Sequence, residues 1–280
     1  MMTDRIETFG QSTIQHGKHS DRVYLMKLGR SDLPELLTRL EELADEKGYS
    51  KIFAKVPDDR LEPFQRRGYR PEARVPGFYQ GDLDAHFLGK YLCPQRREEP
   101  RPGRVAEVLA LARRKSSLPE PPSLSGDYRW RPLSPDDTEA MVAVYRRVFA
   151  SYPFPIHNPA YLARTMAENV RYHGIFRNER LVAIASAELD KSGENAEMTD
   201  FATLPDERGQ GLANYLLTRL EETAANEGIV TAYTIARAYS FGMNITFAKH
   251  GYAFSGTLTR NTQISGELES MNVWYKPLAS

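Results

Sequence analysis

The stretch "TLPDERGQGLANYLLTRLEE", residues 203–222, places a glycine-rich turn directly before a helix. Leu212, Leu216 and Leu220 recur every four residues, which predicts a helix with one apolar face. The first amides of a helix have no partner inside it, and the helix dipole adds partial positive charge there. A phosphate can use these amides where side chains are small enough to let it approach. The turn therefore predicts an anion site at the start of this helix.

Six residues would form this anion site: Arg208, Gly209, Gln210, Gly211, Leu212 and Ala213. They lack the Lys-Ser/Thr pair that completes a P-loop, and they do not fit the G-x-G-x-x-G fingerprint of dinucleotide-binding folds. A tight strand-to-helix connection would favour the same small residues. The six residues alone leave both interpretations open.

Composition limits the classes of protein that fit. The chain has 280 residues, 41% of them hydrophobic, which is enough for two small domains or one large one. Basic and acidic residues balance at 37 each, which argues against a nucleic-acid binder with a broad basic face. A single cysteine excludes a cysteine zinc cluster, and no metal site is expected. With no apolar run of membrane-spanning length and a polar N-terminus, we expect a soluble cytoplasmic protein without membrane partners. The oligomeric state stays open.

Strands alternate with helices through the C-terminal part, residues 126–280, which predicts an α/β domain with a mixed sheet. An earlier segment repeats part of that order. Residues 36–49 and 216–229 are identical at nine of fourteen positions, and in both places a strand, a helix ending in Gly-Tyr and two strands follow. Such a repeat indicates an internal duplication. We therefore expect a half-domain over 1–95 and a linker with a short helix over 96–125.

The first copy is predicted to be degenerate. Ser31 and Leu33 stand where the second copy has Gly211 and Ala213, and Leu33 would obstruct the approach of a phosphate. We expect a structural unit that docks on the second domain and has no cofactor site of its own. The linker is rich in basic side chains, which suits either an anion contact or a solvated helix.

The stretch "MTDFATLPDERGQGLANYLL" resembles the signature of the GNAT N-acetyltransferase superfamily. In that pattern Arg/Gln-x-x-Gly-x-Gly/Ala follows a splayed strand, and Arg208, Gly211 and Ala213 match it. The resemblance implies a GNAT fold, and a turn that holds the pyrophosphate of acetyl-CoA. It also implies that the preceding backbone pairs with the pantetheine arm; these residues are Phe201, Ala202, Thr203 and Leu204. Ser240 occupies the position of a frequent cofactor-binding asparagine.

Three stretches look like a narrower group, the bacterial and archaeal β-lysine N-acetyltransferases: "EMTDFATLPDERGQGLA", "ARAYSFGMNITFAKHGY" and "VFASYPFPIHNP". This resemblance implies that the acceptor is the side-chain amine of β-lysine and that the product is the compatible solute Nε-acetyl-β-lysine. Other acceptors keep the same fold: another small amine or a protein lysine. A non-catalytic acyl-CoA sensor is a third interpretation.

Acetyl transfer to an amine requires a group that takes a proton and a site for the developing oxyanion. Asp200 lies in a strand-like run just before the expected thioester contact, and Glu188 on the preceding strand is a second candidate base. Strict alternation would put Asp200 on the opposite sheet face from Glu197, unless a bulge changes the register. Each carboxylate could instead form a salt bridge. We assign Glu197 to substrate binding.

The proton donor for the leaving thiolate is less evident. Many GNAT enzymes carry a tyrosine where this chain has Phe247, which cannot donate a proton. Tyr239 is the nearest substitute, although it could equally be a packed aromatic side chain.

The loop "SYPFPIHNPAY" joins the first two helices of the C-terminal domain. In the superfamily this region commonly lines the acceptor pocket. Tyr152, His157 and Asn158 are therefore candidate substrate contacts, and three prolines favour a rigid wall. Arg237, just after a strand, could bind a substrate carboxylate or a CoA phosphate. A rigid connector without substrate contacts is the alternative for the loop.

Overall fold

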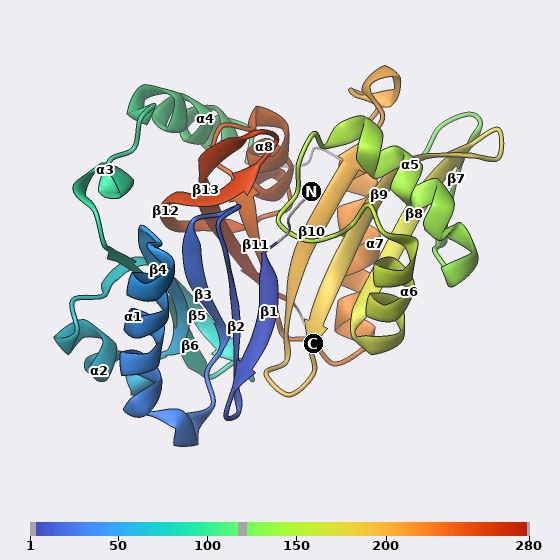
Figure 1. The fold of residues 1–280 in the computed structure, drawn as a ribbon. Helices are drawn as coiled ribbons and strands as arrows, with labels where there is room; N and C mark the ends of the chain where they lie inside the picture. Colours follow the sequence, from blue (N-terminus) through green and yellow to red (C-terminus); the bar gives the residue numbers. More distant parts are fainter. Residues whose placement is uncertain (1–3, 117–121, 279–280) are drawn as a thin grey trace.

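The computed structural model describes residues 4–116 and 122–278 and contains two mixed β-sheets flanked by helices (Figure 1). The predicted fold class, a GNAT-like mixed sheet preceded by a related N-terminal unit, is confirmed. None of the helices in these two ranges is long and apolar enough to cross a membrane.

The first sheet has six strands in the order β1-β2-β3-β4-β6-β5, and we call it with its helices the N-terminal unit. Its elements are β1 Arg5–Phe9, β2 Ser12–Gly17, β3 Arg22–Lys27, α1 Glu35–Lys47, β4 Lys51–Pro57, α2 Leu61–Arg66, β5 Arg70–Tyr79 and β6 Leu83–Tyr91. The α1 helix buries Leu36, Leu37 and Leu40 against one sheet face, as its i, i+4 spacing requires. It ends at Gly48, which adopts the left-handed conformation (φ 62°).

The second sheet has seven strands in the order β12-β13-β11-β10-β9-β8-β7 and forms the C-terminal unit. Its elements are β7 Tyr128–Pro132, α5 Thr138–Val148, α6 Pro159–Glu168, β8 Val170–Arg177, β9 Arg180–Asp190, β10 Asn195–Thr203, α7 Leu212–Asn226, β11 Thr231–Arg237, α8 Phe241–Lys249, β12 Ala253–Ile264 and β13 Glu267–Pro277. Short 3₁₀ turns occur at Arg30–Asp32, Asp58–Arg60, Pro135–Asp137 and Pro205–Glu207.

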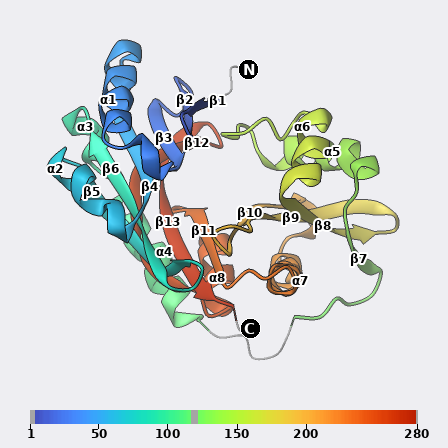
Figure 2. The same cartoon turned by 90° about the horizontal axis from the view of Figure 1, so that it is seen from below.

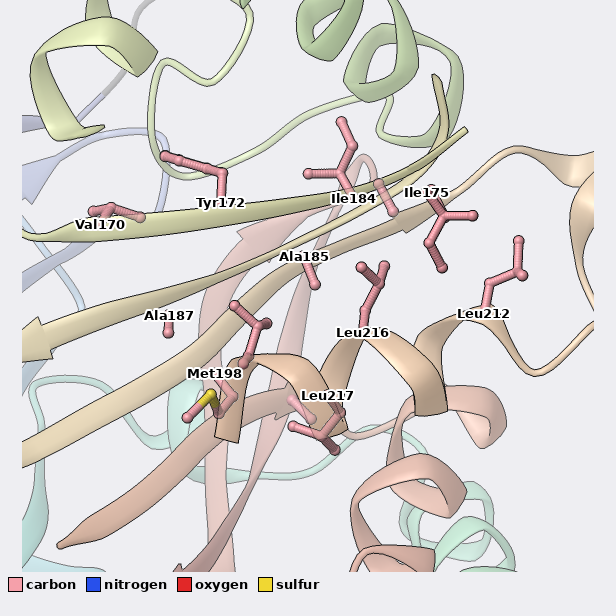
Figure 3. Packing of buried hydrophobic residues seen from close by; sticks show 14 of the residues in the cluster. Val170, Tyr172, Ile175, Ile184, Ala185, Ala187, Met198, Leu212, Leu216 and Leu217 are labelled. Atoms are coloured by element: carbon pink, nitrogen blue, oxygen red, sulfur yellow. The ribbon is translucent and has the colours of Figure 1, made fainter. Parts of the chain in front are cut away.

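Helices cover both faces of strands β8–β10, with α5 and α6 on one face and α7 on the other (Figure 2). Leu212, Leu216 and Leu217 of α7 point toward the strands, whereas Tyr172 on β8 points to the opposite face (Figure 3). The Tyr172 hydroxyl lies 3.1 Å from Thr165 Oγ1 on α6. The middle strand of the three, β9, is thus packed on both faces, which explains its nearly continuous apolar sequence.

The linker contributes two helices, α3 Pro94–Arg97 and α4 Pro102–Arg114. The short helix predicted within the linker is confirmed as α4, which packs against α8 and buries Val105, Val108 and Ala112. Residues 117–121 of the linker lie outside the described residues.

The duplication extends further than the sequence indicated. Strand order β1-β2-β3-β4-β6-β5 repeats β8-β9-β10-β11-β13-β12, and in each unit one pair of central strands is parallel. The three strands of 5–27 had no visible counterpart in the sequence, because only the α1 segment retains similar residues. The N-terminal unit is therefore a copy of the whole sheet except β7.

The two units share a third hydrophobic cluster. Phe53, Phe78 and Phe87 of the N-terminal unit pack with Tyr233 and Val273 of the C-terminal unit. Phe78 and Tyr233 have ring centroids 4.8 Å apart. A common core shows that the units dock through apolar side chains, as we expected for the first copy. The division at residues 95 and 126 stays a prediction.

Polar contacts also join the two units. Lys51 Nζ donates to Glu72 Oε2 (2.8 Å) within the N-terminal unit and to the Thr259 carbonyl (2.9 Å) on β12. The Thr259 amide in turn donates to Glu72 Oε1 at 2.8 Å. Both ionic side chains are buried, so their hydrogen bonds fix the position of the units relative to each other.

Candidate active site

The central strands of the C-terminal unit part from each other. β10 pairs in parallel with β11 only through Asn195–Glu197, opposite Thr231–Tyr233, while it continues along β9 to Thr203. Beyond Glu197 the two strands no longer share hydrogen bonds. The opening between them is the splay that the GNAT resemblance implied.

A β-bulge in β10 determines where Asp200 points. The register against β9 shifts between Thr199 and Ala202, and Asp200 adopts a left-handed backbone conformation (φ 54°). Strict alternation would put Asp200 on the α7 face with Met198, away from Glu197. The bulge instead turns its carboxylate to Ser186 and Tyr152, on the α5–α6 face, so the alternative that the sequence left open, a change of register at a bulge, is the one observed.

The backbone after the bulge faces the opening. The Leu204 amide donates to the Val182 carbonyl of β9 (2.9 Å), so the groups of Thr203 point the other way. Consistently, the Thr203 carbonyl accepts a hydrogen bond from Arg208 Nε at 3.3 Å. Phe201, partly buried, packs edge-on against Phe247 of α8.

The glycine turn leads from this strand into α7. Gly209 and Gly211 have φ values of 83° and 75°, which glycine adopts at little cost, and Gly211 is the N-cap residue of α7. A Cβ atom built at either glycine would meet no heavy atom within 4 Å. Open space therefore lies over the first amides of a fifteen-residue helix, with Arg208, Gln210, Leu212 and Ala213 around it. This arrangement fits the pyrophosphate of CoA.

A cavity of about 840 Å³ lies between the two units beside the splay. Phe201 and Phe247 line it at the splay, Tyr152 and Glu188 line it further along, and the N-terminal sheet closes it. The lining residues contributed by that sheet include Arg22, Tyr24, Met26, Phe53, Lys55 and Tyr79. The N-terminal unit thus forms one wall of this cavity.

Asp200 is held by two hydroxyl groups. Tyr152 Oη donates to Asp200 Oδ1 at 2.5 Å, and Ser186 Oγ donates to Oδ2 at 2.7 Å. Burial raises the pKa of Asp200, and the hydrogen bonds partly offset this because they favour the ionised form. A carboxylate with a raised pKa beside the splay is suited to accept a proton from an amine.

Two more carboxylates face the same cavity. Glu197 and Glu188 are directly opposite each other on β10 and β9. Burial, and then the neighbouring Glu188 charge, raise the pKa of Glu197 to about 7. Glu188 remains accessible to water inside the cavity, yet loss of hydration still raises the pKa of its carboxyl. Acids crowded in this way favour a cationic ligand, which would neutralise them.

The remaining candidates from the sequence lie in different positions. Arg237 lines the cavity, but its Nε and Nη2 form a bidentate pair with Glu269, at 3.1 and 2.5 Å. Ser240 caps α8 by accepting the Met243 amide at 3.4 Å. Tyr239 is not among the residues that line the cavity; its hydroxyl donates to Glu99 of the linker at 2.5 Å. The proton-donor role considered for Tyr239 is therefore not supported by its position.

Only part of the loop between α5 and α6 reaches the cavity. Tyr152 lines it, whereas His157 and Asn158 do not. Asn158 is the N-cap of α6, where its side chain accepts the Ala160 amide at 3.0 Å. Loss of hydration lowers the pKa of His157, whose side chain lies between α5 and the loop. Asn158 thus has a local structural role that its position before Pro159 could have revealed.

Sequence reasoning missed Ser186 and Lys55. Ser186 lies in an apolar strand, and only the bulge at Asp200 brings the two together. Lys55 interrupts the apolar run "IFAKV", a signal that could have been read as a functional charge. Within 4–116 and 122–278, no cluster of three or more His, Cys, Asp or Glu side chains is placed to hold a metal ion.

We predict that Glu197→Gln changes the pH dependence of stability. Because the folded protein holds a proton on Glu197 up to about pH 7, the wild type loses stability between the ordinary carboxyl pKa and pH 7. The loss is at most about 1.4 kcal/mol per pH unit, and the glutamine variant lacks it. In urea unfolding from pH 5 to pH 8, the free energy of unfolding of the variant should rise relative to that of the wild type as the pH rises. If the free energies of unfolding of the two proteins changed with pH in parallel, the raised pKa of Glu197 would be contradicted. Glu98→Gln, at an exposed residue, controls for the loss of one negative charge.

Comparison with known proteins agrees with this geometry. Residues 138–252 match the acetyltransferase (GNAT) family. The chain is 38% identical to beta-lysine N(6)-acetyltransferase of Methanococcus maripaludis over 98% of both chains. It is 30% identical to the Methanosarcina mazei protein of the same name, over 87% of this chain and 97% of that one. It is 33% identical to N-acetyltransferase YodP of Bacillus subtilis, over 88% of this chain and 87% of that one. The chain therefore belongs to the GNAT family and is an acetyl-CoA-dependent N-acetyltransferase.

Proposed function

We propose that the protein transfers the acetyl group of acetyl-CoA to the N6 amine of β-lysine. The product is Nε-acetyl-β-lysine, a compatible solute, and the reaction takes place in the cytoplasm. One structural observation carries the proposal: the carboxylates that line the cavity of about 840 Å³ beside the splay include Asp200, Glu197 and Glu188 on the two central strands β10 and β9. Two relatives that align with most of the chain are named β-lysine acetyltransferases, which supports this choice of acceptor.

Acetyl-CoA would bind along the splay. The amides at the start of α7 and the Arg208 guanidinium would hold the pyrophosphate, because both supply positive charge to an open surface. The backbone of Thr203 would pair with the pantetheine arm, since its groups face away from β9. Ser240, at the start of α8 across the opening, would contribute a hydroxyl.

Asp200 would act as the base. The acceptor arrives as an ammonium ion, and its proton passes to the Asp200 carboxylate. The free amine then attacks the thioester carbon, so a C–N bond forms and the C–S bond breaks. Tyr152 and Ser186 fix the orientation of the carboxylate through their hydrogen bonds and keep it from rotating between one turnover and the next.

The nitrogen loses a second proton when it becomes an amide, and the departing thiolate would take up that proton, directly or through water. The first proton would leave Asp200 for solvent after the product departs. Phe247 occupies the position of the usual tyrosine and lines the cavity, so this chain has no hydroxyl there. A thiolate is a good leaving group near neutral pH, because the ordinary pKa of a thiol is about 8.5. The departure of the thiolate therefore does not require a tyrosine as proton donor.

The shape of the cavity favours a free small molecule over a protein lysine. The N-terminal sheet covers it, and residues such as Tyr24 and Phe53 enclose space that a polypeptide acceptor would need. The crowded acids at Glu188 and Glu197 also suit a ligand with a second cationic group.

Steady-state kinetics with β-lysine, α-lysine and spermidine, detecting the released thiol, test the proposed function. We expect the highest kcat/KM with β-lysine, and nuclear magnetic resonance of the product should show the acetyl group on N6. A preference for spermidine or α-lysine would contradict the acceptor. Binding of acetyl-CoA without thiol release for any amine would instead favour a sensor.

We predict that Gly211→Asp weakens acetyl-CoA binding about tenfold relative to Gly211→Asn. Both replacements meet the same left-handed backbone, so they share its cost, and only aspartate adds charge that repels phosphate. Calorimetric titration of both variants measures the difference. Equal affinities would show that the start of α7 does not bind the pyrophosphate.

We predict that Asp200→Asn lowers kcat by about 10² to 10⁴-fold and leaves acetyl-CoA affinity unchanged. Asparagine tolerates the left-handed backbone at this position and keeps the shape, but cannot take a proton. Ser186→Ala, which removes one hydrogen bond and keeps the charge, should have a smaller effect. A normal kcat for Asp200→Asn with a raised KM would make Asp200 a binding residue only.

A further inference from the structure

Lys55 is a charged side chain at the centre of the N-terminal sheet. It lies in β4 between Phe53 and Pro57 on the face that closes the cavity. Its Nζ donates to the Tyr233 hydroxyl of the C-terminal unit at 3.2 Å and lies 5.2 Å from the centroid of the Phe78 ring. Within the described residues, no carboxylate lies within 4.0 Å of Nζ. An ammonium group has three donors, so two of them remain for a ligand.

The other cations around the cavity are engaged with protein groups or lie at its margin. Arg237 forms its bidentate pair with Glu269. Arg22 Nη1 donates to the Asn261 carbonyl (2.5 Å) and to Thr262 Oγ1 (3.1 Å). Arg30 lies near Asp59 at 3.6 Å, and Arg164 lies near Glu168 at 3.8 Å. Both arginines are largely exposed, as is Lys27. Lys55 is therefore the cation best placed to bind an anionic group inside the cavity.

The charges follow a fixed order from the splay into the cavity. Asp200 lies next to the splay. Glu197 comes three residues earlier on β10, opposite Glu188, and its register partner on β11 is Tyr233. Lys55 reaches that same tyrosine from the N-terminal sheet. The cavity thus presents a carboxylate, then a pair of carboxylates, then an ammonium group. Asp190, two residues after Glu188 on β9, also lines the cavity, and its charge acts on Lys55 together with those of Glu197 and Glu188.

We propose that Lys55 binds the carboxylate of the acceptor and thereby selects a diamino acid over a diamine. This inference rests on the proposed function. An amino acid with two amines matches the order of charges: the reacting amine at Asp200, the second ammonium between Glu197 and Glu188, and the carboxylate at Lys55. Each ligand charge then meets a group of opposite sign, whereas a diamine would leave Lys55 facing only its own neighbours.

The proposal also gives the N-terminal unit a task. It has lost the small residues of a phosphate-binding turn, with Ser31 and Leu33 in their place, yet its sheet supplies Lys55. The duplicated unit would then determine specificity at a site whose chemistry is carried out by the other unit.

The test compares Lys55→Gln with the wild type on two acceptors: β-lysine and pentane-1,4-diamine, which lacks only the carboxylate. We expect the variant to raise KM for β-lysine about 10- to 100-fold, the range for a lost hydrogen bond between charged groups. Its kcat/KM for the diamine should equal or exceed that of the wild type, because a repelling charge is gone. Lys47→Gln, at an exposed lysine of α1, controls for the loss of one positive charge.

The outcomes are distinct. An equal loss of kcat/KM for both acceptors would assign Lys55 a structural role. An unchanged KM for β-lysine would show that Lys55 does not contact it. Either result overturns the inference. If Lys55→Gln does not fold, wild-type selectivity decides, since equal kcat/KM for the two acceptors would also overturn it. A wild type that acetylates neither acceptor would overturn the proposed function itself, before Lys55 is considered.

Discussion

The parting of β10 from β11 after three paired residues is the constraint on which the site depends. A strand that keeps β9 as its neighbour but loses β11 has backbone groups without a sheet partner on one side, and a ligand can supply that partner. The bulge at Asp200 lies at this point and turns a carboxylate into the cavity. One local irregularity thus positions both the expected thioester contact and the expected base.

The two copies of the sheet show how the same topology serves different purposes. In the C-terminal unit the central strands separate and a glycine turn opens the start of α7. In the N-terminal unit the corresponding strands pair over Arg22–Leu25, and Leu33 packs against the core beneath α1. The first copy buries its other sheet face against the second, through Phe53, Phe78 and their partners. The first copy thus has no glycine turn before α1, and the sheet face opposite α1 docks on the second copy.

Much of the fold followed from the sequence, because apolar periodicity and glycine positions are local signals. The α7 stripe, the repeat in α1 and the turn at Gly209–Gly211 were all readable in this way. The direction of the Asp200 side chain could not be read from the sequence, because a bulge reverses the alternation of side chains along the strand. The position of Tyr239 in the chain suggested a proton donor to the thiolate, but its hydroxyl donates to Glu99 of the linker. Lys55 was overlooked because its partners come from the other unit.

A crystal structure with CoA and β-lysine bound would test the central claim most directly, namely that the cavity between the two copies is the acceptor site. We expect the N6 amine beside Asp200, the second ammonium near Glu197 and Glu188, and the carboxylate on Lys55. The CoA pyrophosphate should lie on the amides at the start of α7. Electron density for β-lysine outside the cavity, or with its carboxylate toward the splay, would contradict the account.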